Sequence, residues 1–95
     1  MPETGIGLPP LWEPHALAVY LQWQKSNKAK AARVDELLSS IRKDGPFKGK
    51  GKPEPLKWNL RGCWSRRIDR HNRLIYDVTG DMVVRIQYCG LHYVV

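Results

Sequence analysis

The chain has 95 residues, of which 42% are hydrophobic, and a formal net charge of +7. This length suits one domain with a single modest core, and the apolar content excludes a disordered chain. No apolar run approaches the roughly 18 residues that span a bilayer, and no signal-peptide pattern opens the chain, so we expect a cytoplasmic protein without membrane contact.

The N-terminal part is predicted to hold an extension, a short strand and a helix. Residues 1–10 are rich in Gly and Pro and are expected to be flexible, which leaves one domain over residues 11–95. Leu11 and Trp12 can begin a short edge strand. Pro14 then suits the first turn of a helix over residues 14–25, where apolar and long side chains recur at helical spacing: Leu17, Tyr20, Leu21 and Gln24.

A second helix is predicted between Asn27, which can cap it, and the Gly45-Pro46 pair, which ends it. One face of this helix carries the i, i+3, i+4, i+7 spacing of a buried stripe. The stripe consists of Ala31, Val34, Leu37, Leu38 and Ile41.

Residues 47–56 read as a basic loop, because alternating glycines and the Pro-Glu-Pro centre exclude an interior strand. Period-two patterns then predict strands over residues 63–69, 73–78 and 82–89. One sheet face is expected to carry Trp64, Ile68, Leu74, Tyr76, Val78, Val84, Ile86 and Tyr88. The other is expected to carry Arg67, Arg73, Arg85 and Gln87 and to stay open, while both helices cover the apolar face. The fold class is therefore α+β, with two N-terminal helices on one face of a mostly antiparallel twisted sheet.

The positive charge is concentrated in one third of the chain. Residues 42–73 hold eleven Lys and Arg against three acids, a net charge of +8. Such a field attracts a polyanion, and nucleic acid is the leading candidate; the plain alternative is a solvated basic face. No helix-turn-helix or ribbon-helix-helix pattern favours a DNA-binding repressor. Cys63 and Cys89 lack metal-ligand spacing, so two ordinary half-buried thiols, no metal and no cofactor are expected.

The basic segment contains the groups that metal-free RNA cleavage requires. When the 2′-hydroxyl attacks the phosphorus, a base, an acid and cations for the phosphorane are needed. Glu54 is a candidate base, held between Pro53 and Pro55, and His92 is a candidate acid that titrates near neutral pH. Arg67 and Arg73 can bind phosphate oxygens in bidentate fashion. Further candidate substrate contacts in the segment are Lys50, Lys52 and Arg66.

A family resemblance covers nearly the whole chain, from Trp12 to Tyr93. Residues 46–68, PFKGKGKPEPLKWNLRGCWSRRI, then RLIY at 73–76 and HY at 92–93, resemble the YoeB/Txe toxins of the RelE superfamily. The resemblance implies a RelE-like fold and a type II toxin–antitoxin toxin that cuts messenger RNA in the ribosomal A site by 2′-hydroxyl attack. It implies Glu54 as general base, His92 as general acid, and Arg67 and Arg73 at the phosphate. Lys57 and Tyr93 are substrate contacts on this resemblance alone.

The resemblance also implies partners. They are a YefM-type antitoxin, the ribosome with its message, a second toxin copy within the complex, and operator DNA reached only through the antitoxin. The chain departs from the family pattern in three places: Trp58 stands where His is common, Gly90-Leu91 replaces Arg-Tyr, and Val94-Val95 follow His-Tyr. A non-catalytic RNA- or ribosome-binding protein on the same scaffold is the alternative.

Overall fold

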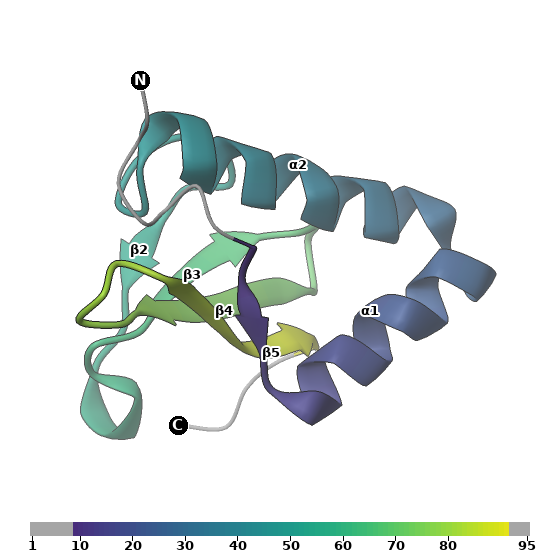
Figure 1. Ribbon diagram of the computed structural model, residues 1–95. Helices are drawn as coiled ribbons and strands as arrows, with labels where there is room; N and C mark the ends of the chain where they lie inside the picture. The colour runs from purple at the N-terminus through teal and green to yellow at the C-terminus, as the bar shows by residue number, and fades with distance from the viewer. Residues whose placement is uncertain (1–8, 92–95) are drawn as a thin grey trace.

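The computed structural model describes residues 9–91. In Figure 1 both helices lie on one side of a twisted sheet, so the predicted α+β architecture is confirmed. No helix in the described part of the chain is both long and apolar enough to cross a membrane. The elements in chain order are β1 (Leu11–Trp12), α1 (Pro14–Ser26), α2 (Lys28–Asp44), β2 (Glu54–Pro55), the 3-10 helix η2 (Trp58–Leu60), β3 (Trp64–Arg67), β4 (Arg73–Val78) and β5 (Val84–Gly90).

The sheet has the strand order β1-β5-β4-β3-β2, with β1 parallel to β5 and the other pairs antiparallel. Both edge strands have two residues. The edge strand β2 lies inside the segment predicted as loop, because Glu54 and Pro55 pair with Ser65 and Trp64. An edge position tolerates the proline, whose missing N–H can face solvent there. The basic segment therefore joins the sheet at Glu54, the candidate base.

The helices begin and end close to where the sequence predicts. The side chain of Asn27 accepts a hydrogen bond from Lys30 N at 3.2 Å, and α2 ends at Gly45 with φ 98°. Of the side chains that recur at helical spacing in α1, Tyr20 packs against the core, whereas Leu21 is 47% exposed. The residues that face the core are Ala16, Val19, Tyr20 and Trp23.

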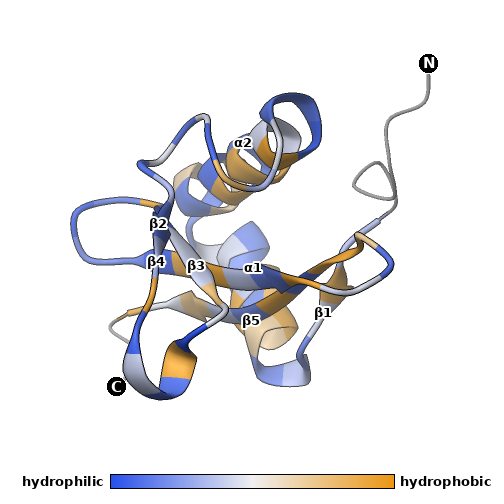
Figure 2. Ribbon diagram, turned by 90° about the vertical axis from the view of Figure 1, so that its left-hand side faces the viewer, coloured by the Kyte–Doolittle hydropathy of each residue, from blue (hydrophilic) through white to orange (hydrophobic). Residues whose placement is uncertain are grey.

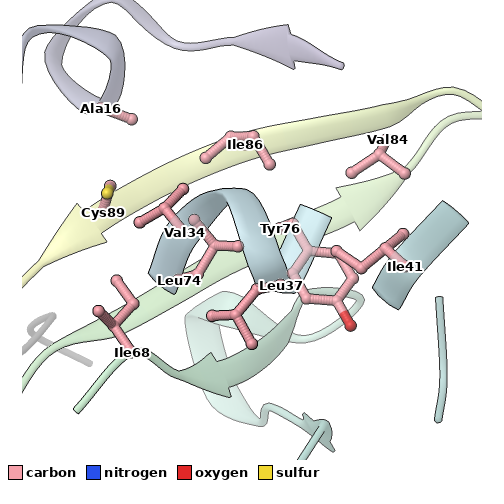
Figure 3. Close-up of a cluster of buried hydrophobic side chains, with 10 residues drawn as sticks. All are labelled: Ala16, Val34, Leu37, Ile41, Ile68, Leu74, Tyr76, Val84, Ile86 and Cys89. Atoms are coloured by element: carbon pink, nitrogen blue, oxygen red, sulfur yellow. The ribbon is translucent and has the colours of Figure 1, made fainter. Parts of the chain in front are cut away.

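The core fills the space between α2 and the sheet. Figure 3 shows Val34, Leu37 and Ile41 of α2 lying over Leu74 and Tyr76 of β4. Figure 2 shows the same amphipathic pattern as hydrophobic and hydrophilic segments that alternate along α2. Both α1 and α2 lie on this face of the sheet. Neither of them covers the opposite face.

A β-bulge changes which residues of β5 face the core. Ile75 pairs with Tyr88 and Tyr76 pairs with Ile86, so Gln87 has no partner on β4. The extra residue reverses the alternation after Ile86. Tyr88, expected on the apolar face, is therefore 39% exposed, and Cys89 is buried in its place. Burial raises the pKa of the Cys89 thiol to about 12, so the group stays protonated in the core.

Candidate functional site

The sheet face that no helix covers, where Ser65 and Ile75 are nevertheless buried, brings the candidate base and two arginines together. Strand register places Glu54 opposite Ser65, Ser65 opposite Ile75, and Arg67 opposite Arg73. Residues that are directly opposite in antiparallel strands share a face, and so do residues two apart along one strand. Glu54, Arg67 and Arg73 consequently lie on one face, the opposite one from the buried Arg66 and Leu74.

Glu54 is fixed through its backbone and leaves its carboxylate exposed. The residue lies in β2, between two prolines that restrict the chain on either side. Among residues 9–91, no side chain forms an ion pair or hydrogen bond with its carboxylate. An exposed carboxylate with no such partner is available to accept a proton from a bound substrate.

Arg67 and Arg73 are held at the end of the β3–β4 hairpin. Arg33 of α2 donates to the carbonyl oxygens of Arg67 and Ile68, both at 3.3 Å, and so anchors the backbone there. Arg73 Nη1 donates to the carbonyl oxygens of Asp69 at 3.1 Å and Asn72 at 3.2 Å. The guanidinium of Arg67 is exposed. Neither arginine pairs with a carboxylate within the described residues, so both can contact phosphate.

The spacing of this group fits a phosphodiester. Arg67 lies one strand away from Glu54, about 5 Å, and two residues along, about 7 Å, by ordinary sheet dimensions. Arg73 lies one strand further, beside Arg67. A phosphate held by the two arginines would thus have the Glu54 carboxylate to one side of it. This arrangement can support proton abstraction next to a charge-stabilised phosphorus.

Arg66, predicted as a substrate contact, is wrongly assigned, because its side chain is fully buried at 0% exposure. All five of its N–H donors are used. Nε donates to Tyr76 Oη at 2.9 Å and Nη1 to Ser40 Oγ at 3.1 Å. The remaining acceptors are backbone carbonyl oxygens at 2.8–3.0 Å. They belong to Gly45, at the end of α2, and to Lys48 and Lys50 of the basic loop. Arg66 therefore holds the loop onto α2 and the sheet.

One glycine makes this close packing of the loop possible. Gly51 has φ +86°, and a Cβ there would lie 2.7 Å from Leu37 Cδ2 and 3.1 Å from Arg66 Cβ. Its carbonyl oxygen accepts from Arg67 N at 2.7 Å. A side chain here would force Leu37 or Arg66 to shift and would strain the backbone at this positive φ, so glycine favours the close approach of the loop to the sheet.

The lysines of the segment are not equivalent. Lys50 Nζ lies 3.5 Å from Glu36 Oε2 on α2, the helix that covers the opposite face of the sheet, so the structure does not bring its charge to the Glu54 group. Lys52 is exposed in the left-handed region with φ 53°, and Lys57 is exposed just after β2. The candidates His92 and Tyr93 lie outside the described residues.

An acid on the open face neutralises one of the predicted arginines. Arg85 forms a bidentate pair with Asp77, at 3.0 Å from Nε and 2.6 Å from Nη2. Sequence reasoning missed this pair, although Asp77 and Arg85 stand at directly opposed positions of two predicted strands. Arg85 is therefore less free for phosphate than Arg67. In the described part of the chain, no cluster of His, Cys, Asp or Glu could hold a metal ion.

Asp69 fixes the turn that carries Arg73. Its carboxylate accepts from His71 N and Asn72 N at 2.8 Å and from Asn72 Nδ2 at 2.9 Å. Burial alone would raise the pKa of Asp69, but these hydrogen bonds outweigh it and hold the pKa below 3.8, its ordinary value.

A lowered pKa means that this stabilisation is present above pH 3.8 and is lost as the pH falls through the folded-state value. We expect Asp69→Ala to be less stable than the parent near neutral pH, with the difference shrinking in acid. Urea unfolding at several pH values measures this. Asp81→Ala, in the exposed turn between β4 and β5, is the control and should show no such pH-dependent gap; a gap that stays constant for Asp69→Ala would contradict the assignment.

The chain is similar to known proteins both in sequence and in structure. Residues 12–93 match the family described as YoeB-like toxin of bacterial type II toxin–antitoxin system. Toxin YoeB of Escherichia coli K12 is 46% identical over 83 residues, which are 87% of this chain and 96% of that protein. The toxin-containing YoeB-YefM complex from Staphylococcus aureus superposes with a TM-score of 0.84 at 41% identity, covering 90% of this chain and 98% of the other. The YoeB dimer from the same organism gives a TM-score of 0.82 at 41% identity, with coverage of 90% and 98%.

Proposed function

This chain belongs to the YoeB-like toxins of bacterial type II toxin–antitoxin systems, and from that membership we propose that it is a metal-independent endoribonuclease that cuts messenger RNA in the ribosomal A site. The observation that carries the proposal is the strand register that gathers Glu54, Arg67 and Arg73 on the sheet face that no helix covers. A protein that only bound RNA would not need a carboxylate at that position, where it repels phosphate.

In the proposed reaction, the Glu54 carboxylate takes the proton of the 2′-hydroxyl as its oxygen attacks the adjacent phosphorus. Arg67 and Arg73 stabilise the charge that develops on the phosphorane oxygens. The bond from phosphorus to the 5′-oxygen breaks, and His92 supplies the proton to that leaving oxygen. The products are a 2′,3′-cyclic phosphate and a 5′-hydroxyl. Lys57, Lys52 and Tyr93 are assigned to substrate contact.

The partners are proposed on the same basis. The Staphylococcus aureus relatives are seen with YefM and as a dimer. For this chain we infer a YefM-type antitoxin whose C-terminal part covers the Arg67–Arg73 face, because a cationic surface attracts an acidic segment that folds on binding. A second toxin copy and, through the antitoxin, operator DNA complete the assembly. A protein that acts on translating ribosomes works in the cytoplasm.

The chemistry of the cut ends tests the mechanism. Cleavage by 2′-hydroxyl attack leaves a 5′-hydroxyl, whereas hydrolysis by a metal-activated water commonly leaves a 5′-phosphate. We expect the downstream fragment from programmed ribosomes to accept label from polynucleotide kinase without prior phosphatase treatment. A fragment that is labelled only after phosphatase would rule out the proposed roles of Glu54 and His92.

A further inference from the structure

Trp58 differs from the other three tryptophans of the chain. Trp12, Trp23 and Trp64 pack against the core, whereas Trp58 is 78% exposed, the highest value among the exposed large apolar side chains of the described residues. It begins η2, in the connection between β2 and β3, which extends beyond the sheet on the side away from both helices (Figure 1). Its indole therefore contributes almost nothing to the core.

The backbone at Trp58 is also unfavourable for a bulky residue. Its φ is +60°, in the left-handed region where a Cβ is crowded. The turn is held by hydrogen bonds from Leu60 N to Lys57 O and from Arg61 N to Trp58 O, both 3.1 Å. The fold thus keeps a large aromatic side chain in a strained conformation and in solvent. Conformations of this kind persist where the surrounding structure enforces them, and they are concentrated at functional sites.

The surroundings of Trp58 suit nucleic acid. Lys57 on one side and Arg61 near the other end of the turn are both exposed, and residues 57–63 contain no acid. Surfaces that bind single-stranded RNA combine cations for the backbone with aromatic rings on which bases stack. The connection that holds Trp58 begins at the end of β2, and Trp58 is four residues after Glu54 in the chain.

We propose that Trp58 stacks on a base of the bound RNA next to the cleaved bond, with Lys57 and Arg61 at the flanking phosphates. The inference deepens the proposed ribonuclease function and rests on it for the identity of the RNA. Trp58 acts in this role as a binding residue and takes no part in proton transfer.

The test compares three substitutions: Trp58→Ala, Trp58→Phe and Trp58→Leu. Losing one stacked base is expected to weaken RNA binding about 5- to 150-fold. We expect Trp58→Ala and Trp58→Leu to raise the concentration of message-programmed ribosomes needed for half-maximal cleavage within this range, while the maximal rate changes little. Trp58→Phe, which keeps a ring, should retain most of the affinity. All three should unfold at the parent's temperature or higher, because the side chain is exposed.

A binding measurement separates this inference from the function. A single-stranded RNA with a 2′-deoxy sugar at the cut site cannot be cleaved. It should quench part of the tryptophan fluorescence of the parent, and this quenching should be missing in Trp58→Phe, which keeps the other three tryptophans. If Trp58→Ala binds and cuts RNA as the parent does, the inference is wrong while the ribonuclease function stands. The inference is also wrong if Trp58→Ala weakens only the antitoxin complex. If the parent binds RNA through Trp58 but never cuts, the function fails and the stacking role remains.

Discussion

Glu54→Gln is expected to lower the cleavage rate by about 100- to 10,000-fold, the usual contribution of a general base. The amide keeps the size of the carboxylate but cannot accept the 2′-hydroxyl proton. Fold stability should not change, because the Glu54 side chain is exposed and no partner in the described residues depends on it. The rate is measured by single-turnover cleavage of a message on programmed ribosomes.

Binding distinguishes loss of chemistry from loss of the RNA surface. Removing one negative charge from a basic segment should leave affinity for the ribosome–message complex equal or tighter. The matched control is Asp81→Asn, in the turn between β4 and β5, which changes another exposed carboxylate that has no ion pair within the described residues and should cut normally. If Glu54→Gln retains both cleavage and toxicity, the protein is not the enzyme proposed here. The non-catalytic binder would then be favoured.

Arg66→Met is expected to reduce the free energy of unfolding by about 3–5 kcal/mol, because several buried acceptors lose a charged donor at about 1–3 kcal/mol each. Methionine fills similar volume but donates no hydrogen bond. The change would remove the donor from three backbone carbonyl oxygens, those of Gly45, Lys48 and Lys50. Ser40 Oγ and Tyr76 Oη would lose one hydrogen bond each and keep their bonds to Lys50 N and Pro46 O. Each unpaired buried acceptor is costly. Urea unfolding measures the loss, and hydrogen exchange should show loosening of the loop over residues 45–51.

The neighbouring Arg67 supplies the control. Arg67→Met changes the same residue type one position along β3, where the side chain is exposed on the opposite face. We expect a stability change within about 0.5 kcal/mol, as for ordinary surface substitutions, together with a large loss of cleavage. The two adjacent arginines should thus separate stability from activity. Equal destabilisation by both variants would contradict the burial of Arg66.

The sequence predicted the fold well because its signals there are local. Helical spacing, the Asn27 cap and the Gly45-Pro46 stop define α2, and the prediction of its buried stripe is confirmed. Period-two patterns likewise located β3, β4 and β5. The errors occur where contacts between residues distant in the chain determine the local structure. The bulge at Gln87, which turns Tyr88 outward, has no local sequence signal, and the two-residue β2 exists only because β3 pairs with it.

For the candidate site, the sequence predicted some residues that the structure brings together and one that it buries elsewhere. Family resemblance marked Glu54, Arg67 and Arg73, and strand register places them on one face. Composition could not distinguish Arg66 from Arg67, since only the alternation of β3 sends one inward to five acceptors and the other to solvent. The assignments of His92 and Tyr93 remain predictions from sequence. At Trp58 the sequence showed only a departure from the family pattern. Its exposure and its positive φ are seen in the structure.

The most direct test maps the cut made by the parent protein on a defined message, with and without programmed ribosomes. Primer extension should reveal a new end within the A-site codon only when ribosomes are present, and the end should be missing with Glu54→Gln and with His92→Gln. A parent protein that binds these ribosomes yet leaves the message intact would contradict the assignment of this chain as a ribosome-dependent ribonuclease.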